Sequence, residues 1–366
     1  MIYLDSAATS LQKPPEVASA MAGAVGLLGN PGRGAHSHAL AATKCVYHGR
    51  KTVASFFGAA PEQVMFTSGA TESLNIAIHG LLGPSDHVIT TVYEHNSVLR
   101  PLYNLQRQGL EISFVKEISH NCLQPATKAV IMTHASNLTG QVFDLKPVSK
   151  FCKKHGLLLI VDAAQTAGSI PISMQYADVL CFTGHKSLLG PQGIGGLVVG
   201  RGVNIRPTKF GGTGMDSFAE TQPDSLPEAL EAGTLNTPGI AGLTAGIEYI
   251  CRIGINNMYQ NALKRAKIFY EGAAKIPGVK IYSDLSTPHV PIVAFNIGDM
   301  DSAMVEFRLS NEHGISVRGG THCAPLHHKL LGTAEQGAVR FSFSSFNTED
   351  EVQTAVQAIA KIAQGI

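Results

Sequence analysis

The sequence has almost no net charge and no long hydrophobic run. Twenty-eight Lys and Arg side chains stand against 27 Asp and Glu in 366 residues, so no overall field attracts nucleic acid or an anionic membrane. No stretch reaches the roughly 18 consecutive apolar residues of a membrane span, and the start, MIYLDSAATS, has no basic segment followed by an apolar one. These absences predict a cytoplasmic protein without nucleic-acid or membrane partners.

The sequence also lacks a cysteine framework. Its six cysteines are scattered and form no C-x-x-C pair, which is typical of free thiols. Only Cys323, in SVRGGTHCAPLHH, has polar and glycine-rich neighbours. Its thiol could bind a metal, undergo redox chemistry, act as a nucleophile or be inert. His322, His327 and His328 do not complete the four-ligand spacing of a structural zinc site, so we expect no metal.

The order of apolar runs predicts an α/β fold with two domains. Between residues 62 and 200, β-branched runs such as HVITTVY, KAVIMTH and LLLIVDAA alternate with helical patterns, which favours a mostly parallel sheet. Residues 201–238 are rich in Gly, Pro and Thr and predict a connecting loop, and residues 239–276 predict helix. We predict a large domain at 16–239 and a small α+β domain formed by 1–15 and 240–366.

Two elements of the small domain are predicted in detail. We expect a helix from about Ser302 to His313. Thr348, with Glu351 three residues later, predicts a capping box at the start of the last helix.

Lys186 and Asp162 each follow a predicted strand. Lys186 lies between the apolar run of CFTGHKSLLGPQGIGGL and its glycine-rich turn, at a strand end where α/β sheets bind ligands. Alone it is consistent with a surface lysine; in context it could form a Schiff base. Asp162 ends the apolar run of LLLIVDAAQTAG and is either a turn carboxylate or the partner of a pyridine nitrogen.

Other polar residues recur at the ends of neighbouring strands. TSGATES places Gly69, Ala70 and Thr71 at a predicted helix N-terminus, where free N–H groups favour a phosphate. His95 in YEHNSV and Asn137 in THASNLTG follow two further strands. Each motif alone is consistent with an ordinary loop. Together they offer the lysine, the carboxylate and the phosphate cradle that pyridoxal 5'-phosphate needs.

These motifs resemble those of the class V aminotransferases, which are fold-type I pyridoxal-phosphate enzymes, and within them the cysteine desulfurase and selenocysteine lyase branch. The resemblance covers essentially the whole chain, from YLDSAATS and PGRGAHSHAL through FTSGATESLN, TGHKSLLGPQGIG and EAGTLNTPGIAGL to VRFSFSSFNTEDEV. It implies a mostly parallel seven-stranded sheet in the large domain. It also implies a homodimer with its site at the subunit boundary.

The resemblance assigns roles to site residues. Lys186 would form the Schiff base, Asp162 would bind the pyridine nitrogen, and His95 would stack on the ring. The remaining cofactor-binding residues that it implies are Gly69, Ala70, Thr71, Asn137, Gln165, Thr183 and His185, with Gly212 and Thr234 approaching the phosphate of the neighbouring chain. The substrate-binding residues that it implies are Arg340, Arg318, Asn137 and His36.

The stretch around Cys323 narrows the expected reaction. RGGTHCA matches the short R-x-G-x-H-C-A loop that carries the persulfide-forming cysteine of such desulfurases. The resemblance implies conversion of L-cysteine to L-alanine: Lys186 removes the α-proton, His95 takes a proton from the substrate thiol, and the sulfur passes to Cys323 as a persulfide. A sulfur-acceptor protein is a further expected partner.

Several alternatives stay open from the sequence alone. Selenocysteine could replace cysteine as the substrate, and a cysteine or cystine C–S lyase would need no protein persulfide. A transaminase would use the same cofactor site, and a non-enzymatic scaffold would not bind the cofactor. Thr321 and the APLHH that follows Cys323 indicate a subgroup, so the sulfur acceptor and the roles of His327 and His328 are not assigned.

Overall fold

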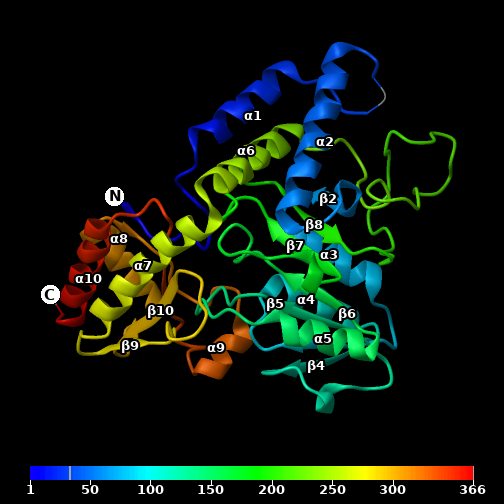
Figure 1. Ribbon diagram of the computed structural model, residues 1–366. Helices are drawn as coiled ribbons and strands as arrows, with labels where there is room; N and C mark the ends of the chain where they lie inside the picture. The colour runs from blue at the N-terminus through cyan, green and yellow to red at the C-terminus, as the bar shows by residue number, and fades with distance from the viewer. Residues whose placement is uncertain (33, 366) are drawn as a thin grey trace.

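The structure is a computed structural model that describes residues 1–32 and 34–365 (Figure 1). A seven-stranded sheet forms its centre. The strand order is β2-β8-β7-β6-β5-β3-β4. The strands are β2 (Val64–Thr67), β3 (His87–Thr91), β4 (Glu111–Val115), β5 (Thr127–Thr133), β6 (Leu158–Asp162), β7 (Val179–Thr183) and β8 (Gly195–Val199). Only β8 runs against its neighbours in this sheet. The prediction of a mostly parallel, seven-stranded sheet is confirmed.

Helices cover both faces of this sheet. They are α1 (Pro15–Leu27), α2 (Ser37–Phe57), α3 (Ala70–Leu81), α4 (Asn96–Gln106), α5 (Leu145–His155) and α6 (Thr237–Ile253), with short 3₁₀ turns at Pro61–Gln63, His120–Cys122 and Met174–Tyr176. Side chains alternate between the faces: on β6, Leu159 and Val161 join one buried cluster and Ile160 joins another. α2, α5 and α6 supply the first cluster, and α3 and α4 the second. The result is a three-layer α/β/α arrangement.

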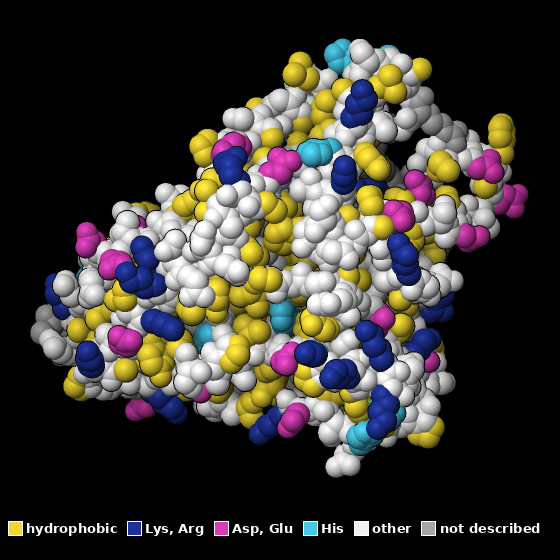
Figure 2. Space-filling view, viewed as in Figure 1, with side chains coloured by type: hydrophobic (Ala, Val, Ile, Leu, Met, Phe, Trp, Pro, Cys, Tyr) yellow, Lys and Arg dark blue, Asp and Glu magenta, His cyan; other side chains and the backbone are white. Residues whose placement is uncertain are grey.

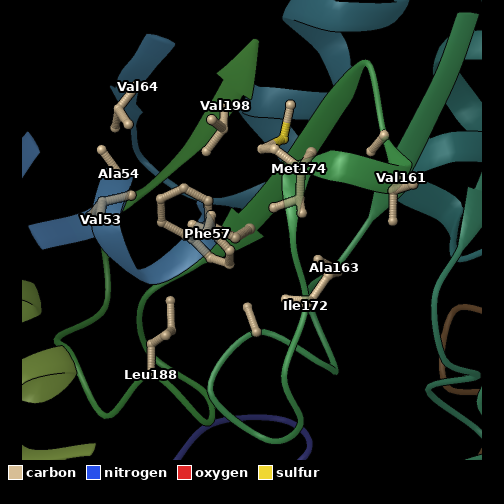
Figure 3. Close-up of a cluster of buried hydrophobic side chains, with 14 of the residues drawn as sticks. Val53, Ala54, Phe57, Val64, Val161, Ala163, Ile172, Met174, Leu188 and Val198 are labelled. Atoms are coloured by element: carbon tan, nitrogen blue, oxygen red, sulfur yellow. The ribbon is translucent and has the colours of Figure 1, made fainter. Parts of the chain in front are cut away.

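Phe57 lies at the centre of the first cluster. Figure 3 shows its ring among Val53, Val198 and Leu188, which come from α2, β8 and the segment after β7. Phe57 and Leu188 are fully buried. Burying a side chain of this size stabilises a fold by about 1.5–3 kcal/mol, so this cluster also anchors the segment that follows β7.

The last part of the chain, together with the first strand, forms a smaller α+β unit. Its strands are β1 (Ile2–Tyr3), β9 (Val279–Ile281), β10 (Ile292–Ile297), β11 (Ile315–Ser316) and β12 (Val339–Ser342), and its helices are α7 (Ile255–Ala273), α8 (Ser302–His313), α9 (Pro325–Leu331) and α10 (Glu349–Ala363). β12, β10 and β9 form an antiparallel sheet, while β1 pairs parallel with β11. Phe269 of α7 stacks on Phe341 of β12 at 4.3 Å between ring centroids, inside a core completed by α8 and α10.

Several sequence predictions can be compared with these elements. The predicted helix from Ser302 to His313 is α8. The predicted capping box is present: the Glu351 N–H donates to Thr348 Oγ1, and the Thr348 N–H donates to the Glu351 carboxylate. Residues 201–236 form turns and irregular loop. The predicted helix at 239–276 is two helices, because the chain breaks at Gly254, whose φ is +91°.

The predicted domain division stays a prediction. The packing adds that α6, which spans the predicted boundary, contacts α1 and α2 and shares the core of the large sheet. Over residues 1–32 and 34–365, no helix combines the length and the apolar character that crossing a membrane requires.

Candidate active site

Five strands of the large sheet end at one pocket of about 370 Å³. Because β2, β3, β5, β6 and β7 run in the same direction, the residues that follow them meet at one edge of the sheet. The pocket is lined by Ser68, Gly69, Ala70, Thr71, Glu72, His95, Ser97, Thr133, Asn137, Asp162, Ala164, Gln165, Thr183, His185, Lys186, Gln192 and Gly193. Ten of the residues predicted from the sequence are in this set.

Lys186 and Asp162 come from neighbouring parallel strands. Asp162 ends β6 and is buried, and its Oδ1 accepts the N–H of Ala164 at 2.9 Å. Burial lowers the pKa of Lys186 to about 8; the Asp162 carboxylate opposes this shift, and Arg340 and Arg318 add to it. Burial raises the pKa of Asp162, against the effects of the Ala164 N–H and Lys186. The site therefore holds an amine that is easily deprotonated next to a buried carboxyl group.

The turn from β2 into α3 forms a cradle of donors. Ala70 and Thr71 open α3, where the first N–H groups have no acceptor within the helix. The Thr71 hydroxyl lies 2.8 Å from Ser97 Oγ. A Cβ at Gly195 would lie 2.6 Å from the Cα of Gly69, so glycine there lets β8 approach this turn. Helix N–H groups and hydroxyls in this arrangement fit a phosphate.

The end of β7 and the N-terminal segment complete the pocket wall. Thr183 ends β7, and His185 Nδ1 lies 3.0 Å from Thr9 Oγ1. Gln165 donates from Nε2 to the carbonyl of Ala7 at 3.1 Å. Burial is the main cause that lowers the pKa of His185 to about 4. An anion bound here would oppose that shift, because it favours the protonated ring.

His95 forms a neutral wall of the pocket. It caps α4: its Nδ1 accepts the N–H of Ser97 at 3.0 Å. Because Nδ1 is an acceptor, the neutral ring carries its proton on Nε2. Burial lowers the pKa of His95 to about 4, and Lys186 and Arg340 add to this effect. The ring is therefore uncharged at neutral pH.

Arg340 joins the small sheet to the pocket. It is buried on β12, donates from Nη1 to the carbonyl of Asn137, and bonds from Nη2 to Asp5 Oδ1, both at 2.9 Å. Its buried Nε has no hydrogen-bond partner among the described residues. A buried N–H with no acceptor is costly, so Arg340 has a donor left for a bound carboxylate.

Hydrogen bonds hold the Cys323 loop against residues of this site. The Cys323 carbonyl accepts the N–H of Asn96, next to His95, at 2.8 Å, and the His322 carbonyl accepts from Asn137 Nδ2 at 2.7 Å. His322 and Cys323 have φ values of +49° and +55°, a left-handed conformation that is uncommon for residues other than glycine. Cys323 is half-buried and is a free thiol.

Six predicted residues lie outside the pocket lining: Arg340 and Cys323, described above, and Arg318, His36, Gly212 and Thr234. Arg318 is exposed and pairs through its backbone with Arg340. His36, Gly212 and Thr234 are exposed on the α1–α2 turn and on the loop before α6.

Within residues 1–32 and 34–365, no group of three or more His, Cys, Asp or Glu side chains is arranged to hold a metal ion.

Several residues of the site escaped the sequence predictions. Ser97 links His95 to Thr71, and Asp5 holds Arg340. Asp5 belongs to YLDSAATS, a motif that could have indicated it. Ser97 is an ordinary serine in a helix start, and nothing in its sequence neighbourhood distinguishes it.

Comparisons with known proteins agree with this geometry. The family model described as Aminotransferase class-V matches residues 2–354. A protein of Methanothermobacter thermautotrophicus named probable cysteine desulfurase is 33% identical over 379 residues, which cover 99% of this chain and 94% of that protein.

Two solved structures are similar over nearly the whole chain. The apo structure of cysteine desulfurase from Thermococcus onnurineus has a TM-score of 0.92 and 34% identity, covering 100% of this chain and 95% of that chain. The structure of the Escherichia coli cysteine desulfurase CsdA has a TM-score of 0.88 and 29% identity, covering 99% and 94%.

Proposed function

Because this chain belongs to the class V aminotransferase family, we propose that it is a cysteine desulfurase that converts L-cysteine to L-alanine and passes the sulfur to Cys323 as a persulfide. One observation carries the proposal: the Cys323 loop is hydrogen-bonded to Asn137, which lines the pocket that holds Lys186 and Asp162, and to Asn96, which lies between the lining residues His95 and Ser97. The names of the similar proteins support it.

The pocket fits pyridoxal 5'-phosphate, the cofactor of this family. The amine of Lys186 and the N–H groups at the start of α3 match its needs, and the orphaned N–H of Arg340 is left for the substrate. Lys186 would form the covalent link, Asp162 would hold the pyridine nitrogen, and the phosphate would lie against Ala70 and Thr71. When bound, this cofactor supplies an electron sink for negative charge at the substrate's α-carbon.

The chain's own residues would bind the substrate and move its protons. Arg340 would orient the substrate carboxylate, since its free Nε and its planar guanidinium suit such a group. With a pKa of about 8, Lys186 is suited to take and return a proton near neutral pH. His95 would take the thiol proton on Nδ1, the unprotonated nitrogen of the neutral ring, so Ser97 would first have to release that nitrogen.

Cys323 would then receive the sulfur. Its thiolate forms an S–S bond to the substrate sulfur while the C–S bond breaks. The electron pair of that bond stays with the substrate's β-carbon, which takes up a proton to give alanine. No external oxidant is required, because the carbon is reduced as the sulfur is oxidised. With selenocysteine, whose selenium leaves more readily, Cys323 would be needed less.

We further propose that the protein is a homodimer. His36, Gly212 and Thr234 are exposed and outside the pocket of their own chain, so the predicted roles of Gly212 and Thr234 at the cofactor and of His36 at the substrate require a second chain. The Gly233 N–H donates to the Gly212 carbonyl, which ties Gly212 to the segment of Thr234. The same loop exposes the side chains Phe210, Met215 and Phe218, and hydrophobic side chains stand out at the tip of this loop (Figure 2).

A cytoplasmic location and a sulfur-acceptor protein stay predictions.

The test is mass spectrometry of the holoenzyme after incubation with L-cysteine. We expect a single extra sulfur on Cys323 and none in a Cys323→Ser variant, which should also lose alanine production. Alanine formation in wild type without an adduct on Cys323 would contradict the proposal. Pyruvate and sulfide from both proteins would instead indicate a C–S lyase, and a requirement for a keto acid would indicate a transaminase.

A further inference from the structure

Three histidines are buried around the Cys323 loop, and the proposed reaction does not use them. His322, His327 and His328 are at most 5% exposed. The His322 and His328 rings lie nearly parallel, with centroids 6.0 Å apart. His322 Nε2 donates to the Ala338 carbonyl at 2.8 Å, and His328 Nδ1 lies 2.8 Å from Thr333 Oγ1. His328 thus links Thr333, which follows α9, to the ring of His322, the residue before Cys323.

His327 connects α9 to the turn that carries Asn137. Its Nδ1 lies 3.1 Å from Ser136 Oγ, which also accepts the N–H groups of Leu138 and Thr139. These two donors occupy the oxygen's lone pairs, so the Ser136 hydroxyl proton points to His327 Nδ1. The His327 and Tyr93 rings also make a T-shaped contact, with their centroids 4.9 Å apart. Two contacts, with the Ser136 hydroxyl and the Tyr93 ring, therefore fix His327 of α9 to the segments that lead to Asn137 and His95.

The conformation of the loop explains why it needs this support. His322 and Cys323 are consecutive left-handed residues, and each such residue costs about 1–2 kcal/mol when it is not glycine. Such backbone persists only where surrounding contacts over-determine it. The contacts here are the Asn137 bond to the His322 carbonyl and the anchoring of α9 directly after the loop.

We propose that His327 and His328 are positioning residues for Cys323, which hold its loop in the left-handed conformation and in register with Asn137. This inference rests on the proposed function, in which Cys323 receives sulfur. His327 acts through Ser136 and His328 through His322. Neither is required to touch the cofactor or the substrate.

The test compares His327→Leu and His328→Leu with His327→Asn, whose amide oxygen can replace Nδ1 as the acceptor of the Ser136 proton. We expect the leucine variants to keep the visible absorbance of the bound cofactor and a KM near that of wild type. Their kcat and their single-turnover rate of persulfide formation on Cys323 should fall by about 10- to 100-fold, since small misplacements of a reacting group have effects of this size. His327→Asn should recover most of the rate.

His87→Leu is the matched control. His87 is fully buried and also makes two side-chain hydrogen bonds, to Thr127 Oγ1 and Ser113 Oγ, but it lies at the start of β3, at the edge of the sheet opposite the pocket. It should lose stability without a selective loss of kcat. Wild-type rates of persulfide formation in His327→Leu would overturn the positioning role. Absence of any Cys323 adduct in wild type would instead overturn the proposed function beneath it.

Discussion

The Glu94 carboxyl group is buried beside His95 and carries no assigned role. One of its oxygens accepts the hydroxyl of Thr91 and, at 3.0 Å, the N–H of Thr133, whereas Oε2 has no partner among the described residues. Burial raises the pKa of Glu94 to about 8, the charge of Asp162 adds to the shift, and the two hydrogen bonds oppose it. Glu94 is therefore mostly protonated at neutral pH.

Replacing Glu94 by Gln should change how stability depends on pH. In the folded protein the Glu94 carboxyl keeps a proton that it loses in the unfolded chain near its ordinary pKa of 4.5. The contribution of this proton to the free energy of unfolding is therefore complete below pH 4.5 and is lost as the pH rises through about 8. Glu94→Gln has no such proton. Urea unfolding should therefore show the variant gaining stability relative to wild type as the pH rises from about 5 to about 9.

Glu62→Gln, at an exposed position, is the control for this experiment. It should follow the wild-type dependence. If the Glu94→Gln and wild-type curves run parallel over the whole range, Glu94 is ionised in the folded protein and the assignment is wrong.

At the scale of residues, the sequence predicts groups that follow strands and misses groups that are defined by burial. Lys186 and Asp162 could be found because each directly follows an apolar run, and the carboxyl ends of parallel strands meet. Glu94 and Ser97 could not, because their importance depends on burial and on partners that are distant in the sequence. Whether Arg340 or Cys323 touches the substrate is still a prediction.

Two turns of the large domain meet at Gly168. The turn after β6 carries Asp162 and Gln165, and the turn after β7 carries Lys186. A Cβ at Gly168 would lie 2.4 Å from the Ser187 carbonyl oxygen, and the φ of Gly168 is +83°. Because the backbones of Gly168 and Ser187 are in contact, this approach sets how far the Lys186 amine lies from the Asp162 carboxyl group.

Gly168→Ala should therefore affect both stability and cofactor binding. A left-handed alanine costs about 1–2 kcal/mol, and here the clash with Ser187 adds to that cost and displaces Lys186. Urea unfolding and titration of the apoprotein with pyridoxal 5'-phosphate measure the two effects.

Gly156→Ala is the control, because Gly156 has a similar φ of +66° at the end of α5 and nothing within 4 Å of its added Cβ. It should show the conformational cost alone, with cofactor affinity unchanged. Equal losses of stability and affinity in the two variants would show that the close approach of the turns is unimportant.

Whole elements are easier to predict from this sequence than the breaks between them. Most strands of the large sheet, unlike the edge strand β4, are apolar runs buried on both faces, so their pattern is distinct. The break between α6 and α7 was missed because apolar residues continue at helical spacing on both sides of Gly254. The antiparallel direction of β8 was also not predicted, since a strand's own sequence does not specify its direction.

At the scale of the whole molecule, the homodimer proposal predicts that two defective chains can complement each other. Lys186→Ala removes the amine from one chain's pocket, and Thr234→Glu places a negative charge where the partner's phosphate would lie. In a mixed dimer, one of the two sites would have both defects and the other neither. After subunit exchange, about a quarter of wild-type activity should return, because half of the dimers are mixed.

Each variant alone should be nearly inactive, and exchange can be followed by native mass spectrometry with one chain isotopically labelled. Mixed dimers without recovered activity would contradict the shared site. A protein that sediments as a monomer while it is fully active would contradict the dimer itself.

The pairing of β1 with β11 has a consequence for the order in which the chain folds during synthesis. Ile2 pairs with Ile315, and Asp5 bonds to Arg340. The seven-stranded sheet has all its strands once Val199 has been made, but β1 must wait for β11, which is made more than 100 residues later. Since domains generally fold as units while the chain emerges, a nascent chain would hold the Lys186 pocket well before it could acquire Cys323 or Arg340. The chemistry of sulfur transfer would thus become available only after Arg340 has been made, long after the Lys186 pocket has formed.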